Sequence, residues 1–197
     1  MITNAEIPYR ICFGILWVLF FGIRVYFQGK VAGRRTVTRV NEKQESFFFR
    51  LSALAYLLLP LYCLTPWLDF AHIPFPGWLR WSGSIIAGAG IFLFGWAHHA
   101  LGENWTAVLA LSPEHELVTR GPYRYVRHPM YSAFFTIGFG FLLLSANWII
   151  GLLYLGTFVL MYAFRVSKEE ELMVSRFGET YRRYMQKTGR IFPRLIQ

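Results

Sequence analysis

Residues 81–101 of this chain read WSGSIIAGAGIFLFGWAHHAL, an apolar run that contains no Asp, Glu, Lys or Arg. A helix needs about 20 predominantly apolar residues to cross the hydrocarbon core of a bilayer, and this run supplies them. Four more apolar blocks lie at residues 11–27, 47–67, 129–144 and 147–164. Because the apolar residues are bunched in blocks and do not recur on one helical face, the sequence predicts membrane-spanning helices.

The last two blocks are separated only by the tight turn Ser145-Ala146-Asn147, so we expect them to form one helical hairpin. The composition fits a membrane protein, because 55% of the 197 residues are hydrophobic and only 16% are charged. Soluble domains, in contrast, are about a quarter charged. We therefore predict an all-α integral membrane protein of about five transmembrane helices. Residues 1–197 contain no repeat or second domain and are expected to form a single transmembrane domain.

The basic residues are distributed unequally between the two sides of this five-span arrangement. Eighteen of the 20 Lys and Arg residues fall on one side, and only Arg10 and Arg80 fall on the other. The positive-inside rule then predicts an amino terminus outside the cell and a carboxyl terminus in the cytoplasm. The net charge of +9 is explained by this topology and by anionic membrane lipids, so no nucleic-acid partner is expected.

The first apolar run is expected to remain in the protein as a span. It is preceded by Glu6 and Pro8, where a cleavable signal peptide would have a basic region. Cys12 and Cys63 both fall inside predicted spans, which favours packing thiols over a disulfide. Small residues in block 81–101 are expected to let another helix approach closely. They are Gly83, Ser84, Ala87, Gly88 and Gly90.

A polar and aromatic segment, residues 115–131 (HELVTRGPYRYVRHPMY), lies between two apolar blocks. Lipid offers no partner to charged groups or exposed backbone, so this segment must lie at the interface or line a protein cavity. Gly121-Pro122 is a turn signal, and Pro129 suits the first turn of the next helix. His128 is then expected at the amino end of that helix, where free N–H groups and the helix dipole favour anions.

The same segment has a simpler interpretation as a basic anchor at the membrane interface. In that case the tyrosines Tyr123, Tyr125 and Tyr131 would belong to an aromatic belt at the level of the lipid headgroups. The spacing of the residues is compatible with both interpretations.

A second candidate site follows the fifth block. Arg165 and Glu169 are one helical turn apart and share a face, so they are able to pair. A carboxylate there can contact a cation, while Arg165 can hold an anion. Glu170 and Glu171 are expected to belong to a solvated extension of the helix. No G-x-G-x-x-G follows a strand-like run, so a Rossmann nucleotide site is not supported.

A metal site at His98, His99 and Glu103 is not expected. The pair of histidines has only Glu103 at helical spacing, and the other histidines lie far along the chain. A coordination shell needs more clustered ligands than this.

Two motifs resemble those of a known family. The pattern His115-x-Leu117-Val118-Thr119-x-Gly121-x-Tyr123, continued by Val126-Arg127-His128-Pro129-x-Tyr131, resembles the cofactor motif of the isoprenylcysteine carboxyl methyltransferase family. Arg165-x-x-x-Glu169-Glu170, followed by Phe177-Gly178-x-x-Tyr181-x-x-Tyr184, is similar to that family's carboxyl-terminal signature. The resemblance covers roughly residues 101–193 and is that of a short, prokaryotic-type member.

The resemblance implies a carboxyl O-methyltransferase in the membrane that uses S-adenosylmethionine and releases S-adenosylhomocysteine. Its methyl acceptor would be the carboxylate of a lipophilic, isoprenylcysteine-like substrate, which Arg165 would face. Residues 101–193 would form the cofactor-binding and catalytic part, with the pocket on the cytoplasmic side and no metal. By the family pattern, the residues that contact the cofactor would be His115, Glu116, Leu117, Val118, Tyr123, His128, Pro129, Met130, Tyr131 and Glu169.

The partners expected from the resemblance are a lipophilic or lipidated substrate from the bilayer and the membrane lipids themselves. The protein is then expected in the cell membrane of a prokaryote. Three other functions remain as alternatives: a phospholipid or amine N-methyltransferase, an NADPH-dependent sterol-type reductase, and a small membrane scaffold whose basic loops bind anionic lipid.

Overall fold

The computed structural model describes residues 4–31, 38–39, 47, 50–51, 59–105, 110–111 and 116–194. Five labelled helices carry the fold: α1 (Ile7–Val31), α3 (Gly77–Leu101), α4 (Pro129–Ser145), α5 (Trp148–Phe177) and α6 (Glu179–Lys187). Three short 3-10 helices accompany them: η1 (Asp69–Ala71), η2 (Gly102–Asn104) and η3 (Gly121–Arg124). The predicted all-α class is confirmed, apart from one antiparallel pairing of the two-residue strands β1 (Thr38–Arg39) and β2 (Ala110–Leu111).

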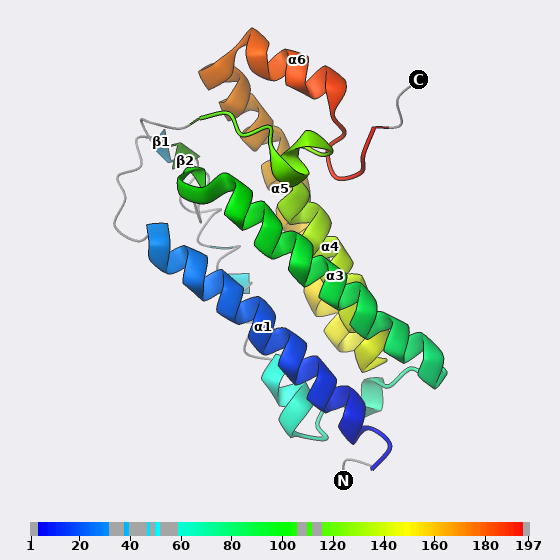
Figure 1. The fold of residues 1–197 in the computed structure, drawn as a ribbon. Coiled ribbons are helices and arrows are strands. Elements are labelled where there is room, and N and C mark those ends of the chain that lie inside the picture. The colour runs from blue at the N-terminus through cyan, green and yellow to red at the C-terminus, as the bar shows by residue number, and fades with distance from the viewer. Residues whose placement is uncertain are drawn as a thin grey trace.

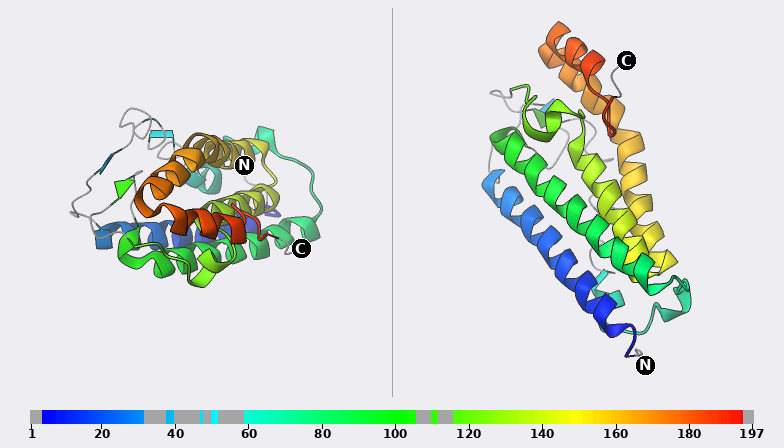
Figure 2. Two further views of the ribbon diagram at one scale, coloured as in Figure 1. Left: turned by 90° about the horizontal axis from the view of Figure 1, so that it is seen from above. Right: turned by 45° about the vertical axis from the view of Figure 1, so that its right-hand side comes forward.

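The long helices lie side by side in an elongated bundle (Figure 1). The described parts of the two chain ends lie at opposite ends of this bundle, and α6 folds back beside the far end of α5 (Figures 1 and 2). The turn between α5 and α6 is made by Gly178, whose φ of +53° is a left-handed conformation that glycine adopts without strain. This turn directs α6 over the loop that precedes α4.

The structure describes helices at four of the five predicted spans. Helices α1, α3 and α5 contain 25, 25 and 30 residues and are long and apolar enough to cross a membrane. Helix α4 is apolar but has only 17 residues, as its short apolar block predicted. Most of the second predicted span, residues 47–67, lies outside the described residues, although residues 59–64 are helical.

The predicted hairpin of α4 and α5 is confirmed, and its turn is built by two residues. Ala146 takes a left-handed conformation with φ of +48° and ends α4. Asn147 caps α5, because its side-chain oxygen accepts hydrogen bonds from the N–H groups of Ile149 at 3.1 Å and Ile150 at 3.2 Å. Its amide group also donates to the carbonyl of Leu68 at 2.6 Å, which ties the turn to the chain before α3.

Glycines allow α3 and α4 to pack with their backbones in close approach. A Cβ added to Gly83 would lie 2.6 Å from the backbone nitrogen of Leu144, and one on Gly90 would lie 2.7 Å from Ile137. Gly140 of α4 faces the backbone of Ala87 in the same way. The predicted close packing is confirmed for Gly83, Ala87 and Gly90. It is wrong for Gly88, which faces open space.

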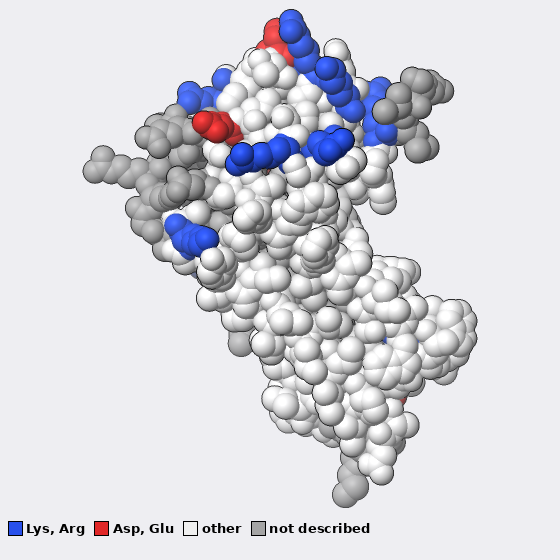
Figure 3. All heavy atoms as spheres, in the orientation of Figure 1, with Lys and Arg blue, Asp and Glu red and all other residues white. Residues whose placement is uncertain are grey.

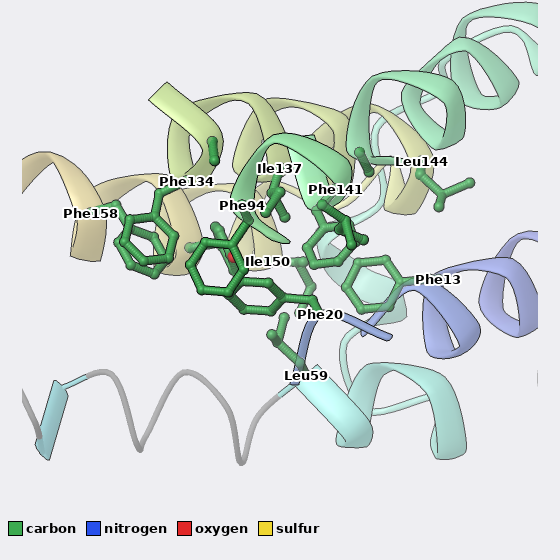
Figure 4. Packing of buried hydrophobic residues seen from close by; sticks show 14 of the residues in the cluster. Phe13, Phe20, Leu59, Phe94, Phe134, Ile137, Phe141, Leu144, Ile150 and Phe158 are labelled. Carbon is green, nitrogen blue, oxygen red and sulfur yellow. The ribbon is translucent and has the colours of Figure 1, made fainter. Parts of the chain in front are cut away.

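Aromatic rings fill the space between the helices. Figure 4 shows Phe20 of α1 beside Phe94 of α3, and their ring centroids are 4.9 Å apart. Phe134 of α4 stacks on Phe158 of α5 with centroids 4.1 Å apart. Because lipid tails are as apolar as these side chains, the contact between rings and backbones is what holds such helices together.

The basic residues visible in Figure 3 gather around the end of the bundle that carries α6. At the opposite end, Arg10 and Arg80 are buried, each with only 4% of its surface exposed. Arg80 pairs with both carboxylate oxygens of Glu6, at 2.5 and 2.8 Å, and Arg10 pairs with Asp69. Each of the two buried arginines at that end is therefore paired with a carboxylate.

The two cysteines, Cys12 and Cys63, are free and half-buried, as expected of packing thiols without a disulfide.

Candidate active site

The loop before α4 folds against the end of α3. Gly121 begins η3 with φ of +60°, and a Cβ there would lie 3.1 Å from the side chain of Ala100. The left-handed backbone conformation favours glycine here, and the space beside α3 is tight for a larger residue. The buried ring of Tyr123 packs against Ala97 and Ala100, together with the partly buried Val118. This packing fixes the loop over the helix end and directs it into α4.

Helix α6 holds the same loop from the other side. The hydroxyl of Tyr184 donates to the carbonyl of Tyr123 at 2.5 Å. Tyr181 is buried, with 2% of its surface exposed. The signature Phe177-Gly178-x-x-Tyr181-x-x-Tyr184 thus provides the turn and the tyrosine that connect α6 to the loop.

The loop, the first turn of α4 and α5 bring together four of the predicted site residues. The Nδ1 atom of His128 lies 3.4 Å from the Glu169 carboxylate, which also accepts a hydrogen bond from the Tyr131 hydroxyl at 3.1 Å. Arg165, one turn earlier on α5, lies 3.4 Å from the same carboxylate. The predicted pairing of Arg165 with Glu169 is confirmed. The Glu169 side chain is 23% exposed and that of Arg165 is 13% exposed.

His128 is placed between two carboxylates. Its other ring nitrogen, Nε2, lies 3.3 Å from Glu170. Burial opposes protonation of the ring, but hydrogen bonds and charge from Glu169 and Glu170 outweigh it and raise the pKa of His128 above its ordinary value. A protonated ring has an N–H to donate on each side, which suits one acceptor at each nitrogen.

The prediction that Glu170 is a solvated residue is wrong. Its side chain is only 5% exposed, and it pairs with Arg127 at 2.9 Å and with Arg190 at 2.7 Å. The reason is the fold of the carboxyl terminus, which returns over the loop before α4 and brings Arg190 to α5. Glu171 is exposed, as predicted.

Three backbone N–H groups around the amino end of α4 already have partners within the chain. The N–H groups of Tyr131 and Ser132 both donate to the carbonyl of His128, at 3.0 and 3.2 Å. The N–H of His128 itself donates to the carbonyl of Arg190 at 2.9 Å. These groups therefore contact the chain itself, and an anion cannot use them in this arrangement.

The remaining predicted cofactor residues lie in different places. His115 is outside the described residues. Glu116 is exposed, and its N–H donates to the side chain of Asn104 at 2.8 Å. Leu117 is half-buried, and Pro129 is buried at the start of α4. Met130 packs against both buried clusters, so it connects the loop around Tyr123 with the bundle core.

The aromatic-belt interpretation fits only one of its three tyrosines. Tyr125 is 49% exposed, whereas Tyr123 and Tyr131 are 7% and 6% exposed and contribute to packing inside the protein.

The alternative metal ligands are not brought together. His98 is fully buried, and its ring packs against Phe94 and Trp105 with centroids 4.2 and 4.8 Å away. His99, the next residue, is exposed. Within the part of the chain that the structure describes, no group of three or more His, Cys, Asp or Glu residues is placed to hold a metal ion.

Comparison with known proteins gives a consistent result. Residues 84–175 match the Isoprenylcysteine carboxyl methyltransferase (ICMT) family. The chain is 35% identical over 88 residues to the Protein-S-isoprenylcysteine O-methyltransferase of Schizosaccharomyces pombe, covering 44% of this chain and 37% of that protein. It is 26% identical over 177 residues to the Probable protein-S-isoprenylcysteine O-methyltransferase of Oryza sativa subsp. indica, covering 89% of this chain and 91% of that one. The chain thus spans well under half of the first relative and nearly all of the second.

A solved structure supports the same relationship. The fold is similar to that of the eukaryotic intramembrane Ras methyltransferase ICMT, with a TM-score of 0.54 and 26% sequence identity. The similarity covers 78% of this chain and 54% of that one.

Proposed function

We propose that the chain, which matches the isoprenylcysteine carboxyl methyltransferase family over residues 84–175, is an integral membrane methyltransferase of that family that uses S-adenosylmethionine. The observation that carries this proposal is the cluster of His128, Tyr131, Arg165 and Glu169. It combines one partly exposed carboxylate with a tyrosine ring, an imidazole and one guanidinium, at the end of the bundle where the basic residues gather.

These residues fit the chemistry of the cofactor. S-adenosylmethionine carries a sulfonium and an ammonium, and cations are attracted to carboxylates and to aromatic faces. Glu169 supplies the carboxylate, and the ring of Tyr131, whose hydroxyl donates to that carboxylate at 3.1 Å, supplies an aromatic face. The protonated His128 ring holds the Glu169 carboxylate in place. When bound, the cofactor supplies an electrophilic methyl group. The protein residues hold and orient the two reactants.

Arg165 is proposed to hold the methyl acceptor. Its guanidinium lies 3.4 Å from Glu169, so an acceptor carboxylate bound there would lie next to the group that holds the cofactor. A carboxylate is already ionised at neutral pH, so its oxygen needs no general base. The contribution of the protein is then proximity and alignment, and Arg165 keeps the acceptor's charge paired while it leaves water.

The proposed substrate is a lipophilic carboxylate of the isoprenylcysteine type, and the product of the cofactor is S-adenosylhomocysteine. An amine acceptor is less compatible, because the guanidinium of Arg165 would repel an ammonium. We place the cofactor-binding and catalytic part at residues 101–193 of a single domain. The cofactor would enter from the cytoplasm, and the acceptor would enter from the bilayer of a prokaryotic cell membrane.

The test is methyl transfer from labelled S-adenosylmethionine to a panel of lipid acids and lipid amines, with the purified protein in vesicles. We expect label to enter a prenylated or otherwise lipophilic carboxylate, and we expect no label in the amines. If label entered only the lipid amines, the protein would be an N-methyltransferase and this proposal would be wrong. Thermal-shift measurements provide a second test, in which S-adenosylhomocysteine stabilises the protein and NADPH does not; the reverse result would support the reductase.

A further inference from the structure

Glu169 and Glu170 are neighbours in the sequence, but their carboxylates have different surroundings. Glu170 accepts hydrogen bonds from Arg127 at 2.9 Å and from two nitrogens of Arg190 at 3.1 and 2.7 Å. His128 approaches the same carboxylate at 3.3 Å. With its side chain 5% exposed, Glu170 has its accepting positions filled by the protein and has no room to bind a ligand directly.

The cations around Glu170 come from separate parts of the chain. Arg127 and His128 lie in the loop before α4, and Arg190 lies in the segment after α6. We call residues 188–191 of that segment the strap. Glu170 itself belongs to α5, so one buried carboxylate connects this helix, the loop and the strap.

Backbone hydrogen bonds attach the strap to the loop independently of these charges. The N–H groups of Arg127 and His128 donate to the carbonyls of Gly189 and Arg190, at 2.8 and 2.9 Å. The hydroxyl of Ser132 donates to the carbonyl of Ile191 at 2.6 Å. At Gly189 an added Cβ would collide with the carbonyl of Phe192, so the strap requires glycine at this turn.

We infer that Glu170 is a positioning residue, which fixes the strap and the His128 ring so that the Glu169 carboxylate is held toward the proposed cofactor site. The ring of His128 is fixed by one carboxylate on each nitrogen, 3.4 Å from Glu169 and 3.3 Å from Glu170. Removing either partner leaves the ring free to turn. The inference rests on the proposed function only for the identity of the ligand in that site.

The charged and titratable groups that face His128 decide how it responds to the loss of Glu170. Glu169 and Glu170 from α5 and Tyr131 from α4 contact the ring directly. Arg165 from α5, Arg127 from the loop and Arg190 from the strap contact the two carboxylates. Without the carboxylate of Glu170, the two arginines would remain beside the ring with fewer negative charges to offset them. The loss of the Glu170 carboxylate and the uncompensated charge of the two arginines would both lower the pKa of His128.

The central experiment compares Glu170→Gln with Glu171→Gln, its exposed neighbour on the same helix. The pKa of His128 is measured by NMR in the full-length protein in detergent, and His128→Gln assigns the signal. Glu170→Gln is expected to lower the pKa of His128 by about 1 or more, as for loss of one close opposite charge. Glu171→Gln is expected to leave it where it is in the wild type. An equal pKa of His128 in the wild type, Glu170→Gln and Glu171→Gln would overturn the inference.

A second variant covers the case in which Glu170→Gln does not fold. The side chain of Arg190 is 46% exposed. Arg190→Gln therefore removes one partner of Glu170 without replacing a buried side chain. Hydrogen exchange of the strap and of residues 127–128 is expected to become faster in this variant, while α3 and α4 remain protected. Unchanged exchange in the strap would contradict its attachment through Glu170.

Kinetics connect the positioning role to the proposed reaction. Glu170→Gln is expected to weaken binding of S-adenosylhomocysteine and to reduce turnover, by about 10- to 100-fold for a misplaced site. Glu171→Gln should match the wild type in both. If the wild-type protein binds no S-adenosylhomocysteine, the proposed function fails, but the results for His128 and the strap still decide whether Glu170 positions this site.

Discussion

The two ends of the bundle both contain buried arginine–carboxylate pairs, but they use them differently. At the end where α1 begins, Arg80 contacts both oxygens of Glu6 and the carbonyl of Leu144, and its guanidinium lies 3.6 Å from the ring centroid of Tyr9. At the end that carries α6, Glu169 has three partners at 3.1 to 3.4 Å, and its side chain is 23% exposed, against 20% for that of Glu6. Exposure does not separate these two carboxylates, but contact length does. The short contacts of Glu6 indicate a structural pair, whereas the longer contacts of Glu169 leave capacity for a ligand.

The same contrast occurs between adjacent residues. Glu170 is as enclosed as Arg80 and connects three parts of the chain, while Glu169 faces the proposed cofactor site. A functional end of this membrane bundle therefore contains both kinds of carboxylate: one that fixes the surroundings and one that remains available.

The largest expected effect is a loss of stability on disrupting the Arg80–Glu6 pair, at the end of the bundle where α1 begins. Arg80→Ala leaves Glu6 and the Leu144 carbonyl without their partner, and breaking a buried pair in this way costs about 3 kcal/mol or more. Thermal denaturation in detergent measures the loss. Arg183→Ala, which removes an exposed arginine of α6, is the control and should have little effect. If Arg80→Ala were as stable as this control, the distinction between the ends would be wrong.

The next largest effect is on catalysis at the proposed site, at the end of the bundle that carries α6. Arg165→Ala is expected to lower turnover of the acceptor by about 100-fold, as for removal of one charged stabilising group, with a much smaller change in binding of S-adenosylhomocysteine. Steady-state kinetics and calorimetry separate the two, again with Arg183→Ala as control. Equal losses in turnover and cofactor binding would contradict the assignment of Arg165 to the acceptor.

A third prediction concerns the packing that connects the two ends. Gly140→Ala places a methyl group against the backbone of Ala87, and overpacking of this kind costs about 1–3 kcal/mol. Gly88→Ala is the matched control, because nothing lies within 4 Å of its added Cβ. Thermal denaturation should show Gly140→Ala destabilised and Gly88→Ala unchanged or stabilised. Similar melting temperatures for the two variants would refute close packing of α3 on α4.

The smallest expected effect is the dependence of stability on pH through His128. Its pKa is raised in the folded protein, so protonation favours folding. That contribution is fully present below about pH 6.5, the ordinary pKa of histidine, and is lost as pH rises through the folded-state value. The stability difference between wild type and His128→Gln should therefore shrink with increasing pH. His99→Gln, at an exposed histidine, serves as control. A stability difference between wild type and His128→Gln that grows with pH would contradict a raised pKa of His128.

The fold and half of the site were predictable because they depend on local patterns. Apolar length predicted α1, α3 and α5, and Ser145-Ala146-Asn147 predicted the hairpin turn. Helical spacing predicted the pairing of Arg165 with Glu169. Each of these follows from residues that are close in the sequence.

The environment of Glu170 was not predictable in this way. Its partner Arg190 is brought to it by the turn at Gly178 and the return of the chain after α6. The periodicity of α5 places Glu170 just beyond an apolar run, where a solvated residue is expected. Only its place beside Glu169 in the family signature gave a signal, and that signal does not distinguish a ligand contact from a positioning role.

The central claim, that the end of the bundle that carries α6 is a cofactor site, is tested most directly by calorimetric titration of S-adenosylhomocysteine into wild-type protein and Glu169→Gln in detergent. The wild type should bind saturably, and Glu169→Gln should bind about tenfold or more weakly, as for loss of one charged hydrogen-bonding partner. Absence of saturable binding to the wild type, or equal affinity of the two proteins, would contradict the account.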